Sequence, residues 1–379
     1  MASPAMPRAS ASALALVPLL GLLLLSAPLL AVSRQGAARP DRTPEQVYRA
    51  ACLNCHGPDG TGVPQTTLGF DLPVPDFTDC SFATREPDSD WLAVVSDGGP
   101  ARAFSKLMPA FHDALTPAEM EAALRHVRGF CGDESWPRGE LNLPRPLVTE
   151  KAFPEDEAVL ATSITPEGGA SVANRLVYEK RIGPRSQVEI VVPYGFRDGG
   201  ADWVTGIGDV ALGFKRSLYH DHRKGTIFSV TGEVVLPTGD EKDGFGKGYT
   251  IFEPFATFGQ ILPGDAFVQF QGGIEIPSDS GKAAKEAFWR TTLGKSISQN
   301  VFGRTWSPMV EIIGFRELED GQSTHWDLVP QMQVTLSTRQ HIMANVGVRV
   351  PLNEREGRHT QILFYLLWDW FDGPLFGGW

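Results

Sequence analysis

From about residue 158 to residue 371, the chain consists of runs of roughly ten residues in which apolar and polar side chains alternate. Side chains of a β-strand point alternately to its two faces, so this period of two predicts strands with one apolar and one polar face. In the clearest run Val268 and Phe270 share one face, and Gln269 and Gln271 share the other. About twelve runs are predicted, at 158–165, 171–181, 186–194, 203–218, 226–236, 248–260, 266–276, 285–297, 302–317, 324–337, 340–351 and 359–371.

Two kinds of fold accommodate such strands: a membrane β-barrel and a soluble β-domain. Most runs are long enough for a tilted crossing of a bilayer, and aromatic residues gather at their ends, as interfacial girdles require. The chain also finishes with the apolar, aromatic run 361–371, followed by Phe376 and Trp379. We therefore predict that 158–379 is an antiparallel β-barrel of the outer-membrane type with an even number of strands. A soluble β-domain is the alternative, and acids such as Glu233, Glu253 and Glu275 are expected to face a solvated lumen.

A different motif, Cys52-Leu53-Asn54-Cys55-His56, lies in the first part of the chain. Two thiols that can add to the vinyl groups of haem, followed by an imidazole for the iron, are typical of c-type haem attachment. A zinc site would need two further ligands at ordinary spacing, and a thioredoxin-like motif would need a βαβ context. Because neither is present, Cys52 and Cys55 are predicted to hold one covalent haem c, with His56 as the proximal ligand.

The residues around this motif predict a small helical domain over 40–135. Thr43 and Gln46 form a capping-box pattern ahead of a helix that runs into the motif. Thr116 and Glu119 repeat the pattern ahead of a second helix with one apolar face.

The sixth ligand of the iron is predicted to be Met108. Its thioether is a soft ligand on a proline-containing loop, and histidine–methionine ligation raises a haem potential. His112, Met120 and His126 are the rivals. Met120 has the spacing of helix core, and His126 should lie against the first helix.

Residues 1–33 have the pattern of a secretory signal peptide, with Arg8, an apolar run over 13–32 and a small-residue exit. An uncleaved membrane anchor is the alternative. Export to an oxidising compartment makes the two remaining cysteines, Cys80 and Cys131, a candidate disulfide, with two free thiols as the alternative.

Between the two predicted domains, residues 136–157 are rich in proline and acids. This composition predicts an extended linker between independently folded parts. The formal net charge of the chain is −11, which argues against a nucleic-acid partner.

Residues 40–135 resemble the monohaem (class I) cytochrome c family. The resemblance rests on the opening helix, the haem motif with Gly57, the stretch 59–62, the Met108-Pro109 loop and the closing helix. It implies an electron carrier with Cys52 and Cys55 as anchors, His56 proximal and Met108 distal. It also implies a proline carbonyl that accepts the other proton of the proximal imidazole, for which Pro64, Pro73 and Pro75 are candidates.

The second region resembles the outer-membrane barrels grouped with the phenol meta-pathway transport family, through residues 205–213 and 233–240. The combination predicts an electron-transfer protein, not an enzyme, whose haem is held at the periplasmic face of the outer membrane. Periplasmic redox proteins and outer-membrane lipid are the expected partners. The alternative is a porin or transporter for a small apolar compound with an accessory cytochrome. A haem peroxidase would need an exchangeable sixth position, which Met108 would close.

Overall fold

The computed structural model describes residues 41–200, 202–298 and 304–369. The predicted signal peptide (1–33), the end of the last predicted strand beyond Asp369, and both Phe376 and Trp379 lie outside the described residues. Among the described residues, no helix combines the length and the apolar character needed to cross a bilayer.

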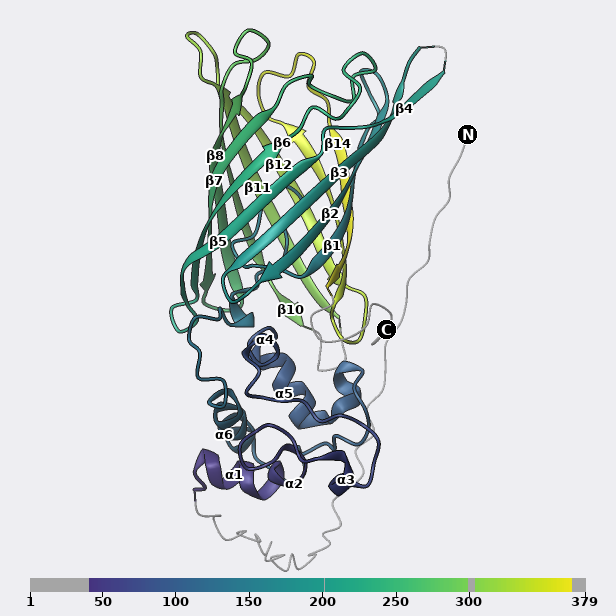
Figure 1. The fold of residues 1–379 in the computed structure, drawn as a ribbon. Coiled ribbons are helices and arrows are strands. Elements are labelled where there is room, and N and C mark those ends of the chain that lie inside the picture. Colours follow the sequence, from purple (N-terminus) through teal and green to yellow (C-terminus); the bar gives the residue numbers. More distant parts are fainter. Residues whose placement is uncertain (1–40, 201, 299–303, 370–379) are drawn as a thin grey trace, which may run out of the picture. The chain divides into compact units, whose positions relative to one another are not determined.

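The first part of the described chain is helical (Figure 1). Thr43 and Gln46 form the predicted capping box at the start of the first helix, and Thr116 and Glu119 form another at the start of the last long one. Val47 is fully buried in a cluster with residues of that last helix. The helices are α1 (Pro44–Ala51), α2 (Leu53–His56), α3 (Gln65–Leu68), α4 (Cys80–Ala83), α5 (Asp88–Asp97) and α6 (Pro117–Arg128), with 3₁₀ turns η1 (Gly99–Arg102) and η2 (Gly139–Leu141).

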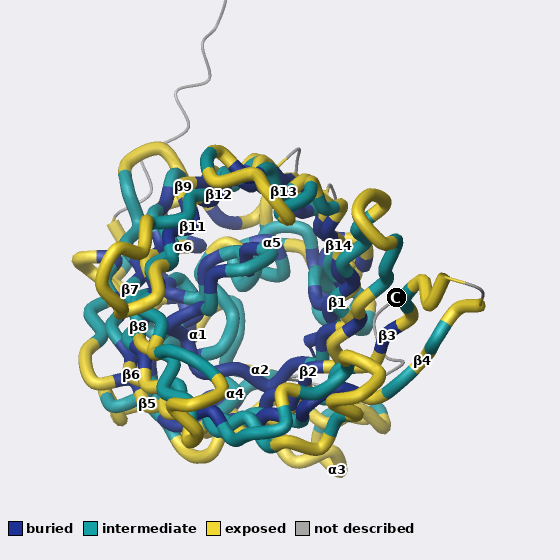
Figure 2. The backbone as a smooth tube through the Cα atoms, turned by 90° about the horizontal axis from the view of Figure 1, so that it is seen from above, coloured by how far each residue is buried: buried dark blue, intermediate teal, exposed yellow. Residues whose placement is uncertain are grey.

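The second part is one antiparallel sheet that closes on itself, because β1 pairs with β14 and β9 pairs with β11. Figure 2 shows the wall from above as a ring. The closed ring contains twelve strands, as predicted; β4 (Trp203–Ile207) adds to the far end of β3, and β10 (Ile297–Ser298) adds to β11. The wall strands are β1 (Glu157–Thr165), β2 (Ser171–Ile182), β3 (Ser186–Asp198), β5 (Ala211–Asp221), β6 (Thr226–Val235), β7 (Ile251–Leu262), β8 (Ala266–Pro277), β9 (Glu286–Lys295), β11 (Thr305–Glu317), β12 (His325–Thr335), β13 (Ile342–Pro351) and β14 (Gln361–Asp369).

Along the wall, apolar side chains are exposed and polar side chains are buried, which is the opposite of the pattern in a soluble sandwich. Phe270 is 40% exposed, whereas its neighbours Gln269 and Gln271 are each 1% exposed. Leu176 is 48% exposed, whereas Glu179 is fully buried. Apolar side chains therefore cover the outside and polar side chains fill the inside, which is the arrangement of a barrel in lipid.

The two ends of the barrel differ in the length of their connections. At one end, three residues join β2 to β3 and three join β7 to β8; at the other, fifteen join β6 to β7 and nine join β13 to β14. The helical part contacts the end with the short turns. The ring of His341, beside β13, lies 3.0 Å from the Glu86 carboxylate, and Arg339 donates to the carbonyl of Ala103 (3.2 Å).

Residues 143–156, which we call the inner segment, lie inside the barrel (Figure 1). Inward-facing side chains from opposite sides of the wall contact it, including Gln269 of β8, Glu311 of β11 and Tyr365 of β14. Residues 136–157 were predicted to be an extended linker between independently folded parts, and 143–156 is the part of this range that contacts the wall. The segment is extended, but side chains of the wall satisfy its backbone polar groups, so it is folded with the barrel.

Candidate functional site

The haem motif lies at the junction of α1 and α2. Cys52 follows the last residue of α1, and Cys55 and His56 end α2, so the three side chains are within little more than one helical turn. Gly57 then takes a φ of 74°, a left-handed conformation that glycine adopts without strain. Tyr48 fixes this turn, because its buried hydroxyl donates to the Gly57 carbonyl (2.6 Å).

Apolar and aromatic side chains surround the motif. The ring of His56 stacks on Phe77 with centroids 4.7 Å apart, and Cys52 packs on a cluster that contains Phe77 and Trp91. Burial lowers the pKa of His56 to about 4, so its imidazole is neutral at pH 7, the form that binds metals. Burial, together with the neighbouring Cys55, raises the pKa of Cys52 to about 11.

These residues fit a covalently attached haem. Cys52 and Cys55 are both free thiols, and the structure pairs neither with another cysteine. The Nδ1 atom of His56 is buried and has no hydrogen-bond partner among the described residues, so this nitrogen is not used by the surrounding protein. The Pro64 carbonyl already accepts from Thr67 within α3 (2.8 Å). Bound haem would supply a one-electron redox centre, and the protein would supply its anchors, a neutral imidazole and an apolar surrounding.

Met108 lies on the loop between η1 and α6, which hydrogen bonds attach to the end of α5. The Met108 carbonyl accepts from Gly99 (3.0 Å), and its amide donates to Ser105 (3.2 Å). Gly98 has a φ of 83°, and a Cβ there would lie 2.9 Å from the Met108 carbonyl oxygen. Glycine at this position thus allows the Met108 loop to approach α5, and the Met108 side chain remains partly exposed.

The three rival ligands have other roles. Met120 is 9% exposed and belongs to the cluster between α1 and α6. His126 packs against the ring of Tyr48, with centroids 4.9 Å apart. His112 is half exposed, and its Nδ1 is 2.9 Å from the Ser96 carbonyl. The packing of Met120 and His126 leaves Met108 and His112 as the available candidates.

The remaining cysteines are joined: Cys80, at the start of α4, forms a disulfide with Cys131, just beyond α6. The bond closes a loop across 51 residues that contains α5 and the Met108 loop. It therefore constrains the segment that would carry the distal ligand.

We expect Cys80→Ser/Cys131→Ser to lower the unfolding free energy of the helical part by about 2–4 kcal/mol, because the unfolded chain regains the entropy of a long loop. The measurement is thermal unfolding followed by helical circular dichroism, with and without reductant. Reductant should bring the original chain to the midpoint of the variant. Identical midpoints for all samples would show that the bond does not constrain the native structure.

Inside the barrel, a buried ion network fixes the inner segment. Arg145 donates to Glu157 of β1 (2.5 Å) and to Glu179 of β2 (2.8 Å), and its carbonyl accepts from Tyr365 (2.6 Å). Glu311 accepts from the backbone amides of residues 147, 148 and 149 at 2.7–3.1 Å. These charged and backbone groups are thus paired within the lumen, as burial requires.

Cross-strand register also aligns glutamates on neighbouring strands. Glu157 is opposite Glu179, and Glu179 is opposite Glu189. Glu189 is opposite Gly213, and Gly213 is opposite Glu233. Glu233 is in turn opposite Glu253. Like charges directly opposite each other destabilise a sheet, so this row is unfavourable for the wall alone. The row continues through Glu275, Glu286 and Glu317 toward the end with the long loops. The acids are visible in the sequence, but their alignment is visible only in the register of the strands.

Comparison with known proteins divides the chain in the same way as the structure. Residues 39–127 match the family described as cytochrome c oxidase, cbb3-type, subunit III. Residues 164–357, more than half of the chain, match the family described as the putative MetA-pathway of phenol degradation. No curated protein matches this sequence significantly.

Among solved structures, the chain is similar to the COG4313 outer membrane channel from Pseudomonas putida F1, with 12% identity and a TM-score of 0.42 over 60% of this chain and 99% of that chain. It is also similar to the NanC porin, with 9% identity and a TM-score of 0.40 over 56% of this chain and 98% of that chain.

Proposed function

The chain belongs to the family described as the putative MetA-pathway of phenol degradation, and from this premise we propose that it is an electron carrier whose single haem c is fixed to an outer-membrane barrel. The observation that carries the proposal is the haem motif with a neutral, partly buried His56 on the same chain as a closed barrel with an apolar exterior. Periplasmic redox proteins are the proposed donors and acceptors.

In this proposal, Cys52 and Cys55 anchor the haem, His56 is the proximal ligand and Met108 is the distal ligand. The packing of Met120 and His126 supports the choice of Met108, because their side chains already stabilise the helical part. A methionine ligand would favour the reduced iron and leave no open position for peroxide. The protein is therefore proposed to transfer electrons and not to catalyse oxidation of a bound substrate.

The proposed side of the membrane follows from the connections between strands. Outer-membrane barrels have short periplasmic turns and longer extracellular loops. The inner segment enters from the end with the three-residue turns, which supports a periplasmic helical part. The inner segment is held inside the barrel by hydrogen bonds to several strands, so in this proposal the haem-binding part is attached more closely than it would be by a free linker.

The test is a haem stain with optical spectra on separated inner and outer membranes from cells that mature c-type cytochromes. The full chain should carry covalent haem in the outer-membrane fraction, and Cys52→Ser/Cys55→Ser should lose the stain while its barrel stays in that fraction. Covalent haem in the soluble fraction would refute the membrane attachment. Stain retained by the double variant would refute the assignment of the anchors.

The row of glutamates favours a second function, passage of a solute through the barrel. The row extends from the start of β1 to the end of β11, so carboxylates face the lumen along its height. Such a lumen suits a cationic or polar solute better than the small apolar compound expected from the sequence. We expect channels formed by the purified chain to prefer K⁺ over Cl⁻, as measured by the reversal potential across a salt gradient. An anion preference would exclude a role for the row in selectivity.

A further inference from the structure

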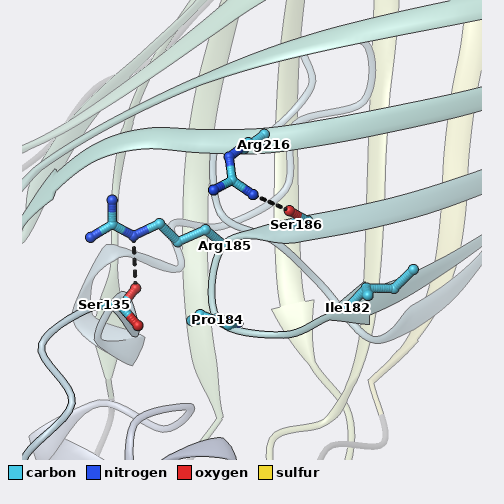
Figure 3. Close-up of a pocket in the computed structure, with 6 residues that line it drawn as sticks. All are labelled: Ser135, Ile182, Pro184, Arg185, Ser186 and Arg216. Atoms are coloured by element: carbon cyan, nitrogen blue, oxygen red, sulfur yellow. Dashed lines mark hydrogen bonds between the residues drawn. The ribbon is translucent and has the colours of Figure 1, made fainter.

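A pocket of about 290 Å³ opens at the turn between β2 and β3 (Figure 3). None of the residues around it has a part in the proposed electron transfer. Figure 3 shows the guanidinium groups of Arg185 and Arg216 extending on the same side of this turn. The residues that line the pocket are Ser135, Ile182, Pro184, Arg185, Ser186 and Arg216.

The two arginines have most of their hydrogen-bond donors unused. Arg185 donates from Nε to the Ser135 carbonyl (3.0 Å), and Arg216 donates from one terminal nitrogen to Ser186 Oγ (2.9 Å). Within the described residues, neither guanidinium forms another hydrogen bond or a salt bridge. The pKa of Asp133 is lowered mainly by hydrogen bonds from Ser135 and least by the charge of Arg185. A guanidinium has five N–H donors, so the pair offers a concentration of unneutralised donors in a chain of net charge −11.

Strand register places this pocket on the outer face of the barrel. Ile182 is opposite Ser186, and Ser186 is opposite Arg216, so the three side chains form one row across β2, β3 and β5. Ile182 itself is 54% exposed. The same faces of these strands continue away from the short turns with exposed apolar side chains, namely Tyr178, Ile190, Leu212 and Phe214.

The pocket therefore lies where the apolar band of the wall meets its short-turn end. At this level of a bilayer, the headgroups replace the acyl chains as the neighbours of the protein. Arginine forms paired hydrogen bonds with phosphate oxygens, and the apolar residues beside it suit an acyl chain. The arginines suit the phosphate group of a phospholipid, and the apolar side chains beside them suit its acyl chains, at the same place on the barrel.

We propose that Arg185 and Arg216 bind the phosphate group of a phospholipid in the leaflet next to the short turns. The acyl chains of this lipid pack on the apolar face above Ile182. Because Arg185 also holds the carbonyl of Ser135, the bound phosphate stabilises the attachment of the segment that leads from the helical part into the barrel. Free phosphate offers the same oxygens, but the apolar face above the pocket favours the lipid.

The experiment is native mass spectrometry of the full chain in detergent, titrated with a short-chain phosphatidylglycerol. We expect Arg185→Gln/Arg216→Gln to weaken lipid binding about tenfold or more, because two charged donors are lost. Arg223→Gln is the matched control, since Arg223 is an exposed arginine in the next short turn, between β5 and β6. It should bind lipid as the original chain does.

Inorganic phosphate alone is the second probe. Binding of inorganic phosphate as tight as that of the lipid would replace the lipid assignment with a free-anion site. Equal lipid binding by the original chain and the double variant, or an equal loss in Arg223→Gln, would overturn the proposal. If the double variant does not fold, the single variants Arg185→Gln and Arg216→Gln provide the same comparison, with Arg216→Lys expected to restore part of the binding.

Discussion

Glu311→Ala is expected to release the inner segment from the wall and to open the barrel to ions. The Glu311 carboxylate accepts hydrogen bonds from the amides of Leu147, Val148 and Thr149 and from the Thr149 hydroxyl. Hydrogen bonds to a charged group stabilise by about 1.5–3 kcal/mol each, and buried donors without a partner are costly. Even a loss on the order of 3–5 kcal/mol would change the ratio of bound to released segment by two to four orders of magnitude.

The measurement is single-channel conductance in planar bilayers. The original chain should show a low conductance, because the inner segment occupies the lumen, and Glu311→Ala should show larger and more frequent openings. Glu275→Ala is the matched control, because this lumen glutamate of β8 belongs to the row of glutamates and forms no hydrogen bond or ion pair with residues 143–156 in the described part of the chain. Equal conductance in all three proteins would mean that the inner segment does not limit passage.

Met108→Ala is expected to change the optical spectrum and the reduction potential of the bound haem. Loss of the thioether leaves the iron without its proposed sixth ligand, so a low-spin spectrum should become high-spin. The potential should fall, because methionine ligation favours the reduced state, and axial ligands cover a range of about 0.8 V. Optical spectra and a redox titration of the full chain in detergent measure both changes.

Met120→Ala distinguishes a ligand from a packing residue. Met120 is buried between α1 and α6, so its truncation should lower the unfolding free energy by about 2–5 kcal/mol and leave the spectrum unchanged. His112→Ala should change neither property, because the ring is half exposed. A high-spin spectrum in His112→Ala together with a normal one in Met108→Ala would transfer the distal role to His112.

The strands were predictable because each carries its own signal. Alternation of side chains predicted β8 over 266–276, and the structure has Ala266–Pro277. Each of the other runs contains a strand of the ring, but the run 203–218 is divided into β4 and β5, and β4 lies outside the ring. The helices were harder. α1 and α6 begin with a capping box, whereas α5 follows Pro87 without a side-chain cap and its sequence gave no strong periodic signal.

The inner segment could not be predicted from local sequence, because its partners lie far along the chain. Its prolines and acids have the composition of a solvated linker. The groups that satisfy it include Gln269, Glu311 and Tyr365, each of which is more than one hundred residues away from its partner in the segment. Only the closed wall brings them together. The sequence showed the cysteines and histidine of the haem motif, but the hydrogen bond from Tyr48 to the Gly57 carbonyl, nine residues further on, has no sequence signal of its own.

The closing pair of the wall has a consequence for how the chain assembles. Glu157 of β1 pairs with Asp369 of β14, so the first wall strand can complete its pairing only after the last strand has been synthesised. Contacts between residues so distant in sequence form slowly. Residues 143–156 directly precede β1 and contact strands on both sides of this seam, Glu179 of β2 and Tyr365 of β14. The inner segment can therefore complete its contacts only when the wall has closed.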